Sequence, residues 1–317
     1  MTFQNRNKTK KGGNFIELLL KKSKLMRSLF ITFLVFQNSF QLFGQKELRQ
    51  KLENKIASKN TIVGISIKNI ESKDTLSING NLIAPLMSVF KFHIALTVLN
   101  LVDEGKLSLE QNIFVKKEDL HSGTWSPIRD EFPNGNMNLT LDQLLSYTVS
   151  HSDNNGCDIL LSLIGGTETV QQFINQHGIK DFTIKVNENE MQQWESLFIN
   201  TSTPIATTEL LEKFFNNQVL TRQSTTYLYK LMVECSRGIT WMKAGLPTGT
   251  ELAHRTGMSG VDENNLRAAM NDVGIFKLPN GNHIIVSIYL TNCMEKQKDS
   301  EKIIADITRT IWKYYTK

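Results

Sequence analysis

The spacing of apolar residues predicts strands near both ends of the chain and helices between them. Residues 61–70 and 74–80 have the pattern of the two strands of a hairpin. Strand patterns return late in the sequence, at 250–260, 269–279 and 282–292. The segment LPNGNH predicts the turn between the last two of these strands.

Helical periodicity fills the rest of the chain. Residues 46–59 predict a polar helix with a thin apolar stripe, and an apolar helix begins at Ser88 and runs to about Glu104. The pattern from 105 to 231 is mostly helical, and a last amphipathic helix is expected over 299–315.

The order of these elements predicts the fold class and the domains. Because strands flank a long helical region, both ends of the chain are expected to build one sheet, with an all-helical region inserted between them. We therefore expect an α+β protein with a sheet domain at 46–86 and 232–317 and an all-helical domain at 87–231. The length of 317 residues, with 40% hydrophobic and 21% charged residues, is sufficient for a sizeable core.

The first 45 residues have the features of a leader. Basic residues precede the apolar run Leu29–Phe36, and small or polar residues follow up to Gln45. This is the pattern of a secretory signal peptide, with Met26 as a plausible true start, and it predicts a periplasmic protein. The alternative is a membrane anchor, although the apolar run is short for a bilayer span.

The charge of the chain is concentrated in this leader. Residues 1–45 contain eight basic side chains and one acid, a net charge of +7, whereas the whole chain carries +5. Subtracting the leader leaves −2 for the rest. The predicted mature protein therefore lacks the basic character of a nucleic-acid-binding protein.

Cysteine and histidine usage argues against a disulfide scaffold and a metal centre. Cys157, Cys235 and Cys293 are widely spaced and odd in number, so they cannot all pair. None of the six histidines lies at metal-ligand spacing from another. We therefore expect no metal and no cofactor.

One tetrapeptide, Ser88-Val-Phe-Lys91, places a lysine three residues after a serine at the start of the apolar helix. This spacing keeps both side chains on one face of a helix. A buried lysine in its neutral form can accept the proton of a serine, which makes the hydroxyl a nucleophile. The alternative is a helix N-cap serine beside a lysine that extends toward solvent.

Two further motifs are ordinary when each is taken alone. Ser152-Asp153-Asn154 lies at a turn between two predicted helices. Arg255-Thr256-Gly257 lies on a predicted strand, where the glycine allows a ligand to approach the backbone closely. In this order, and on helix, turn and strand, the three motifs match the Ser-x-x-Lys, Ser-Asp-Asn and Lys-Thr-Gly set of the penicillin-recognising serine enzymes.

The chain resembles the class A serine β-lactamases, and most closely the branch with the PER, VEB and CfxA enzymes. The phrases PLMSVFKFHIA, TWSPIRDEFPNG, YTVSHSDNNGCDILL and LPTGTELAHRTGMSG carry the resemblance, which extends over about residues 46–315. It implies a five-stranded antiparallel sheet flanked by the N- and C-terminal helices. It also implies a monomeric periplasmic enzyme that hydrolyses penicillins and cephalosporins, without stable membrane association after removal of the signal.

The resemblance implies a role for each catalytic residue. Ser88 would attack the lactam carbonyl, with Lys91, or Glu188 acting through a water, as the base. Ser152 would pass a proton to the leaving nitrogen, and Glu188 would activate the water that cleaves the acyl-enzyme. Glu188 is assigned from the branch pattern NExxM at 187–191. Taken alone, Glu188 has the alternative of a solvated surface acid, because Glu190 and Glu195 lie beside it.

The resemblance also implies a set of substrate-binding residues. Backbone N–H groups of Ser88 and Met258 would form the oxyanion hole, and Asn154 would bind the acylamide side chain. Gln192 falls where the family places a second side chain on the deacylating water. The substrate carboxylate would be received by Arg255, Thr256 and Ser259. Trp125 is expected at the site entrance, with packing inside its own loop as the alternative.

The sequence departs from the family in three ways. Arginine occupies position 255 in place of the usual lysine. The places of a second, carboxylate-binding arginine hold Met270 and Trp241, so Arg237 or Arg267 is expected to substitute. Met87 replaces the cysteine that precedes the nucleophile in many class A enzymes, which leaves Cys157 as a buried, unpaired thiol.

Three alternatives remain open at this point. A peptidoglycan D,D-carboxypeptidase or transpeptidase shares the three motifs and would hold a stable penicilloyl-serine. A non-catalytic sensor domain would also stay acylated, but it should have a membrane-spanning helix. An unrelated secreted helical binding protein would require all three motifs to be coincidence.

Overall fold

The computed structural model describes residues 44–317. The predicted signal peptide at 1–45 therefore falls almost wholly outside the described residues. Residues 44–56 form a helix, as expected for 46–59. Residues 51–317 make up one compact unit, and the elements described below lie within it. Within the described residues, no helix is both long and apolar enough to cross a membrane.

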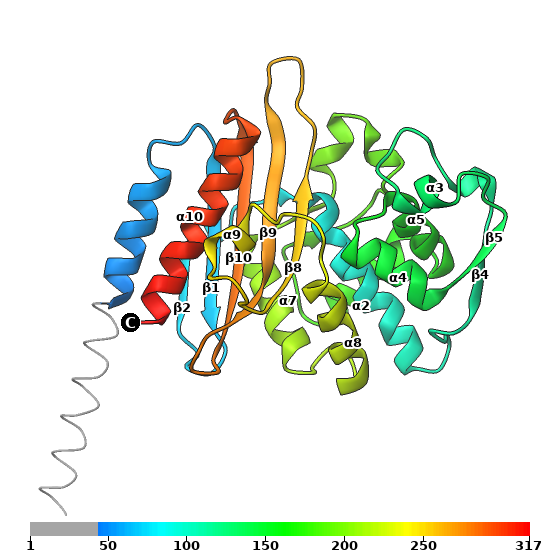
Figure 1. The fold of residues 1–317 in the computed structure, drawn as a ribbon, viewed down its shortest axis with the longest axis horizontal. Helices are drawn as coiled ribbons and strands as arrows, with labels where there is room; N and C mark the ends of the chain where they lie inside the picture. Colours follow the sequence, from blue (N-terminus) through cyan, green and yellow to red (C-terminus); the bar gives the residue numbers. More distant parts are fainter. Residues whose placement is uncertain (1–43) are drawn as a thin grey trace, which may run out of the picture. The chain divides into compact units, whose positions relative to one another are not determined.

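A five-stranded antiparallel sheet, in the order β2-β1-β10-β9-β8, forms the centre of this unit (Figure 1). Its strands are β1 (Ile62–Asn69), β2 (Thr75–Ile78), β8 (Leu252–Met258), β9 (Arg267–Lys277) and β10 (His283–Cys293). The predicted α+β class, and the joining of strands from both ends of the chain, are confirmed. β8 lies at one edge of the sheet, so one side of its backbone has no neighbouring strand.

Helices cover both faces of the sheet. The strand register shows which helix packs on which face. Phe276 pairs with Ile284 across β9 and β10, and its ring lies 5.9 Å from Trp312 of α10 (Gln297–Tyr315). Side chains alternate along a strand, so Tyr289 faces the other way. Its hydroxyl lies 2.8 Å from that of Thr207 on α7 (Pro204–Phe215). This double covering explains why these strands appear in the sequence as continuous apolar runs.

The region between β2 and β8 is mostly helical. Its α-helices besides α7 are α2 (Phe90–Asp103), α3 (Pro127–Glu131), α4 (Leu141–Ser150), α5 (Asn154–Leu163), α6 (Thr167–Gln176), α8 (Arg222–Val233) and α9 (Met242–Gly245). Its 3₁₀ turns are η1 (Met87–Val89), η2 (Lys117–Asp119), η3 (Glu190–Gln192) and η4 (Glu195–Phe198).

Short strands also occur in this region, so the expectation that 87–231 is all-helical needs correction. β4 (Asn112–Val115) pairs with β5 (Met137–Thr140), and β7 (Thr201–Ser202) lies between β3 (Ala84–Pro85) and β6 (Phe182–Thr183). Each is two to four residues long. A segment this short contains too few alternations for a period of two to be recognised.

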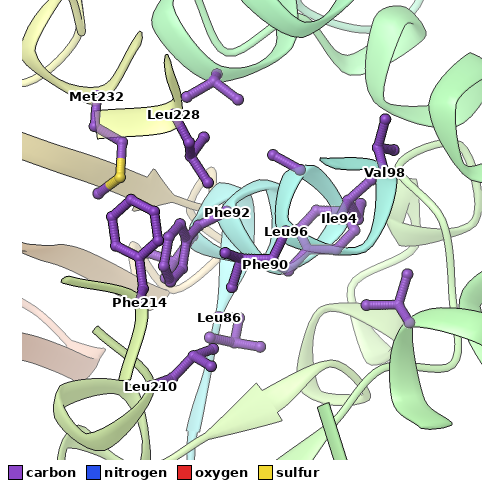
Figure 2. Close-up of a cluster of buried hydrophobic side chains, with 14 of the residues drawn as sticks. Leu86, Phe90, Phe92, Ile94, Leu96, Val98, Leu210, Phe214, Leu228 and Met232 are labelled. Carbon is purple, nitrogen blue, oxygen red and sulfur yellow. The ribbon is translucent and has the colours of Figure 1, made fainter. Parts of the chain in front are cut away.

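The helix α2 runs through the core and positions the first motif. Every residue from Phe90 to Leu99 is buried, which is typical of a helix surrounded by protein on all sides. Phe92 packs edge-to-face on Phe214 at 5.3 Å, and Leu210 and Met232 lie around the same cluster (Figure 2). Tight packing of this kind restricts the movement of the side chains that the helix presents at its start.

His93, on α2, is fully buried and is expected to make the fold sensitive to acid. Its ring stacks on Phe182 at 4.4 Å, and Nδ1 has no hydrogen-bond partner among the described residues. Burial lowers the pKa of His93 from 6.5 to about 3. The unfolded chain therefore binds a proton at this histidine well before the folded chain does, so stability is complete above pH 6.5 and falls as the pH drops toward 3.

We expect unfolding at pH 5 to be easier than at pH 7 by about 2 kcal/mol because of this one group. His93→Phe retains a ring against Phe182 but cannot bind a proton. The parent and the variant should be unfolded in denaturant at both pH values. An equal loss of stability in the two proteins would show that other groups cause the acid sensitivity.

Candidate active site

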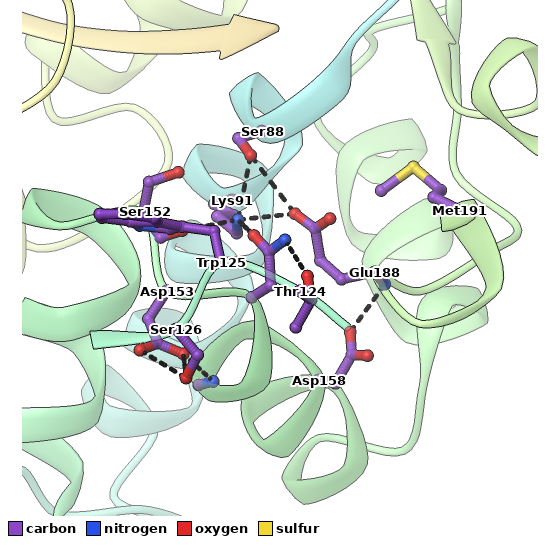
Figure 3. Close-up of polar contacts among 12 residues, drawn as sticks. Ser88, Lys91, Thr124, Trp125, Ser126, Ser152, Asp153, Asp158, Glu188 and Met191 are labelled. Atoms are coloured by element: carbon purple, nitrogen blue, oxygen red, sulfur yellow. Dashed lines mark hydrogen bonds and ion pairs between the residues drawn. The ribbon is translucent and has the colours of Figure 1, made fainter. Parts of the chain in front are cut away.

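Ser88, in the turn η1, and Lys91, in the first turn of α2, lie close together, as their spacing predicts (Figure 3). Lys91 is completely buried, so it does not extend toward solvent. Its Nζ donates to Ser88 Oγ at 3.0 Å, to the Ser152 carbonyl oxygen at 3.2 Å and to Asn154 Oδ1 at 2.5 Å. Its fourth close contact is an ion pair with Glu188 Oε1 at 2.6 Å. One nitrogen thus connects three segments of the predicted site: the Ser88 segment, the Ser152 turn and the Glu188 turn.

Glu188 lies beside the nucleophile and is not a solvated surface acid. It is only 8% exposed, and Ser88 Oγ donates to Glu188 Oε1 at 3.4 Å. Asp158 of α5 fixes this turn by accepting the backbone N–H groups of Glu188 at 2.8 Å and of Asn189 at 3.0 Å. Burial raises the pKa of Asp158 to about 6, against the opposing effect of these two hydrogen bonds. Glu190 is exposed.

The Ser152 turn presents two of its three polar side chains to the site. Asp153 instead caps α5, accepting from the Gly156 N–H at 2.8 Å, and it also accepts from the Ile128 N–H at 2.7 Å. Ser152 has φ +61° and Met87, just before the nucleophile, has φ +48°. Such conformations cost about 1–3 kcal/mol each for residues other than glycine and are concentrated at functional sites.

The third motif lies on the edge strand β8. Arg255 is completely buried, and its Nη2 donates to Ser152 Oγ at 2.8 Å. The Ser259 N–H donates to Ala269 of β9, so in an antiparallel ladder the N–H of the preceding residue, Met258, points away from β9. The edge strand thus has a backbone donor directed outward near Ser88.

Gly257 brings this strand against the nucleophile. A Cβ atom at Gly257 would lie 2.6 Å from the Leu86 carbonyl oxygen and 3.1 Å from the Ser88 nitrogen. Backbone atoms cannot move aside as a flexible side chain can. We expect Gly257→Ala to displace the start of α2 and to lower kcat/KM by at least about 100-fold.

Gly260→Ala is the matched control for this prediction, because a Cβ there meets no atom within 4 Å. Steady-state hydrolysis of a chromogenic cephalosporin by the two variants compares them directly. Similar activities for the two variants would mean that the close approach at Gly257 is not required.

A cavity of about 370 Å³ opens beside these residues. Seven of the predicted residues line it: Ser88, Trp125, Ser152, Asn154, Thr256, Gly257 and Met258. Trp125 is half exposed, and its indole donates to the His151 carbonyl oxygen at 3.0 Å. The guanidinium of Arg237, which also lines the cavity, lies 4.4 Å above the Trp125 ring.

Five predicted residues do not line the cavity: Lys91, Glu188, Arg255, Gln192 and Ser259. The first three contact Ser88 or Ser152, which do line it. Gln192 is exposed, and its amide donates to Asn189 Oδ1 at 3.0 Å rather than to Glu188 or Ser88. The Ser259 hydroxyl faces the backbone, accepting from the Ala268 N–H at 3.0 Å and donating to the Gly260 carbonyl at 2.8 Å. These contacts direct neither the Gln192 amide nor the Ser259 hydroxyl into the cavity.

The structure also locates the residues at which the sequence departs from the family pattern. Met270 is completely buried, whereas Trp241 lines the cavity. Arg267 donates to the carbonyl of Ser259 and is not among the lining residues. Cys157 is buried as a free thiol, and burial raises its pKa well above the ordinary value.

Three residues that support the site escaped sequence reasoning. Asp158 holds the Glu188 turn, as described, and Thr124 Oγ1 accepts from Asn154 Nδ2 at 2.5 Å. Asn271, buried on β9, donates to the carbonyl oxygens of Pro85 at 2.7 Å and Leu86 at 3.2 Å, just before the nucleophile. The sequence does show Asn271 as a polar residue inside an apolar strand. Its partners could not be recognised, because they lie more than 180 positions away in the chain.

No cluster of three or more His, Cys, Asp or Glu side chains suitable for a metal ion occurs in residues 44–317. The described site presents a serine hydroxyl, a lysine amine and a glutamate carboxylate. This arrangement can form and cleave an ester at Ser88.

The model of the β-lactamase enzyme family matches residues 47–315. The chain belongs to this family. Among curated β-lactamases, VEB-1 of Pseudomonas aeruginosa is 45% identical over 92% of this chain and 96% of the relative. The extended-spectrum β-lactamase PER-1 of the same organism is 34% identical over 91% of this chain and 93% of the relative.

Solved β-lactamase structures have the same fold. The TLA-3 extended-spectrum β-lactamase superposes with a TM-score of 0.85 at 41% identity, over 86% of this chain and all of that chain. A class A β-lactamase from Bacteroides cellulosilyticus gives 0.83 at 32% identity, over 86% and 98%. The prediction of a class A serine β-lactamase related to VEB and PER is thereby confirmed, and the chain is a hydrolase of this class.

Proposed function

We propose that this β-lactamase opens the lactam ring through an acyl-enzyme on Ser88 and hydrolyses that ester with Glu188. The observation that carries the proposal is the position of Lys91 Nζ, in contact with both Ser88 Oγ at 3.0 Å and Glu188 Oε1 at 2.6 Å. A proton lost by the hydroxyl can pass to the lysine, or to the carboxylate through a water.

The proposed acylation step uses the residues around the cavity. The backbone N–H groups of Ser88 and Met258 stabilise the negative oxygen that forms when the carbonyl is attacked. Ser152 passes a proton to the leaving nitrogen. Its Oγ accepts from Arg255 and its carbonyl oxygen accepts from Lys91, and these contacts hold the residue beside the cavity. Asn154 binds the acylamide group of the substrate.

We propose that the substrate carboxylate is bound by Thr256 and Arg237. Both line the cavity, whereas the guanidinium of Arg255 is completely buried and donates to Ser152. Arg237 is thus favoured over Arg267 as the replacement for the missing family arginine, since Arg267 does not line the cavity. Arg255 then does not contact the substrate. It contributes its positive charge and its hydrogen bond to Ser152 Oγ.

We propose penicillins and cephalosporins as substrates, with antibiotic resistance as the physiological result. The names of PER-1 and TLA-3 describe them as extended-spectrum β-lactamases, which supports the inclusion of cephalosporins. The leader pattern supports export to the periplasm, and the net charge of −2 for the rest of the chain argues against a nucleic-acid partner. We also propose a monomer without stable membrane association after signal removal. We further propose that boundaries at 86/87 and 231/232 separate the sheet domain from the helical domain, with Ser88 at their junction.

The proposal is tested by mixing the purified mature protein with a chromogenic cephalosporin while following product and intact protein mass. We expect many turnovers per enzyme and no lasting adduct. A single burst with a persistent adduct on Ser88 would reject the role of Glu188 and support a penicillin-binding peptidase instead.

A further inference from the structure

Behind the cavity, four ionisable side chains are buried together where α8 ends against β8 and β9. Cys235, which follows α8, is 3% exposed, and His254, Arg255 and Asp272 are at most 1% exposed. None of these side chains is among those that line the cavity. Charged groups this deeply buried need partners of opposite charge, or they destabilise the fold.

The contacts of the cluster form a chain that leads to the catalytic turn. Asp272 accepts from the Met242 N–H at 3.0 Å and lies 2.9 Å from His254 Nδ1. The Cys235 thiol donates to the Arg237 carbonyl oxygen at 3.7 Å, and it lies near enough to His254 and Arg255 to shift the pKa of each. Arg255 Nη2 then donates to Ser152 Oγ at 2.8 Å.

Arg255 lacks an oxygen partner for most of its charge. Its Nε and Nη1 are buried and have no regular hydrogen-bond partner among the described residues. The other groups that act on its charge are Cys157, a thiol on α5, and Glu188, which is already paired with Lys91. Cys235 is therefore the neighbour still able to supply a negative charge to this guanidinium.

The ionisation of the cluster is consistent with this assignment. Burial alone would raise the pKa of Cys235, but the charges of His254 and Arg255 lower it to about 7. Burial alone would lower the pKa of His254, but Asp272 and Cys235 raise it to about 10. While His254 is protonated, an ionised thiol gives two positive and two negative groups that balance, whereas a neutral thiol leaves one buried positive charge in excess.

We propose that Cys235 acts as a thiolate that neutralises Arg255 and His254, and is thereby a positioning residue for Ser152 in the β-lactamase reaction. This inference rests on the proposed function for its kinetic consequence. When the thiolate is protonated, Arg255 loses its nearby counter-charge, and its bond to the Ser152 hydroxyl is held less firmly. Acylation should therefore slow as the pH falls through about 7.

Two variants separate charge from packing. Cys235→Ser retains a small polar group but removes the anion, and Cys235→Asp restores an anion that does not titrate near pH 7. Cys293→Ser is the control, because Cys293 is another buried thiol, 3.2 Å from Ser300 Oγ on α10. Thermal unfolding of each variant at pH 8 identifies any that fail to fold.

The first measurement is the rate constant of Ser88 acylation by the chromogenic cephalosporin across pH 5–9. We expect Cys235→Ser to acylate about 10-fold more slowly at pH 8 and to lose the parental inflection near pH 7. Cys235→Asp should regain most of the rate, also without that inflection, and Cys293→Ser should resemble the parent. A parental rate and pH profile in Cys235→Ser would overturn the proposal.

The second measurement needs neither turnover nor a Cys235 variant. In the Cys157→Ala/Cys293→Ala protein, Cys235 is the only thiol of the chain, and its ultraviolet thiolate absorbance can be followed against pH. Appearance of one thiolate near pH 7 supports the proposal, and a thiol that stays protonated to pH 9 overturns it. Because acylation and thiolate formation are both read without turnover, failure of the proposed hydrolysis would be recognised separately.

Discussion

Glu188→Gln should convert this β-lactamase into a protein that acylates but no longer turns over. Glutamine has nearly the same shape, so Lys91 and Ser88 keep a polar neighbour, but an amide cannot take a proton from water. General-base catalysis of this kind contributes about 10²–10⁴-fold, and kcat should fall by that amount. Intact mass after mixing with a cephalosporin should show one acyl group on nearly every molecule.

Glu190→Gln is the matched control for this substitution. Glu190 lies two residues away in the same turn, but it is exposed, and its Oε2 accepts the Asn187 N–H at 2.8 Å. We expect a change in kcat of less than about threefold, since an exposed acid contributes little beyond its local contacts. If Glu188→Gln and Glu190→Gln both turned over like the parent, the assignment of the deacylating base would be wrong.

Local patterns in the sequence were sufficient for the main architecture and for the three motifs. The strands β9 and β10 are eleven residues long and almost wholly buried, so their apolar runs are unmistakable. The Ser88–Lys91 pair is recognisable because its geometry depends only on helical spacing. The order of the motifs then identified the family before any contact was known.

What the sequence did not predict depends on contacts between distant segments. Asp158 and Glu188 are 30 positions apart, and their meeting is determined by how the turn after β6 folds onto α5. The function of Arg255 is similar, because only the folded structure buries its guanidinium and directs it to Ser152, 103 positions away. Periodicity and spacing contain no information about such pairs.

Lys91→Ala should keep the fold but lose rapid acylation. The substitution removes the nitrogen that contacts Ser88, Glu188 and Asn154, so the hydroxyl loses a group that can take its proton once the ammonium has passed its own proton to Glu188. We expect acylation to slow by about 10²–10⁴-fold, with no acyl adduct accumulating on a timescale that saturates Glu188→Gln. This difference between the two variants separates a residue needed for acylation from one needed for deacylation.

The free energy of unfolding gives an independent test of the ion pair between Lys91 and Glu188. Removing Lys91 leaves the carboxylate of Glu188, 8% exposed, without its buried counter-charge, and breaking a buried pair costs about 3–5 kcal/mol. Lys302→Ala, which removes an exposed pair with Asp306 on α10, should cost less than about 1 kcal/mol. Denaturant unfolding of Lys91→Ala with and without Glu188→Gln should show that the second substitution restores part of the lost stability, because it removes the unpaired charge.

The acylation rate decides the role of the lysine separately from its effect on stability. If Lys91→Ala acylated at the parental rate, the lysine would have no part in the mechanism, whatever it contributes to stability.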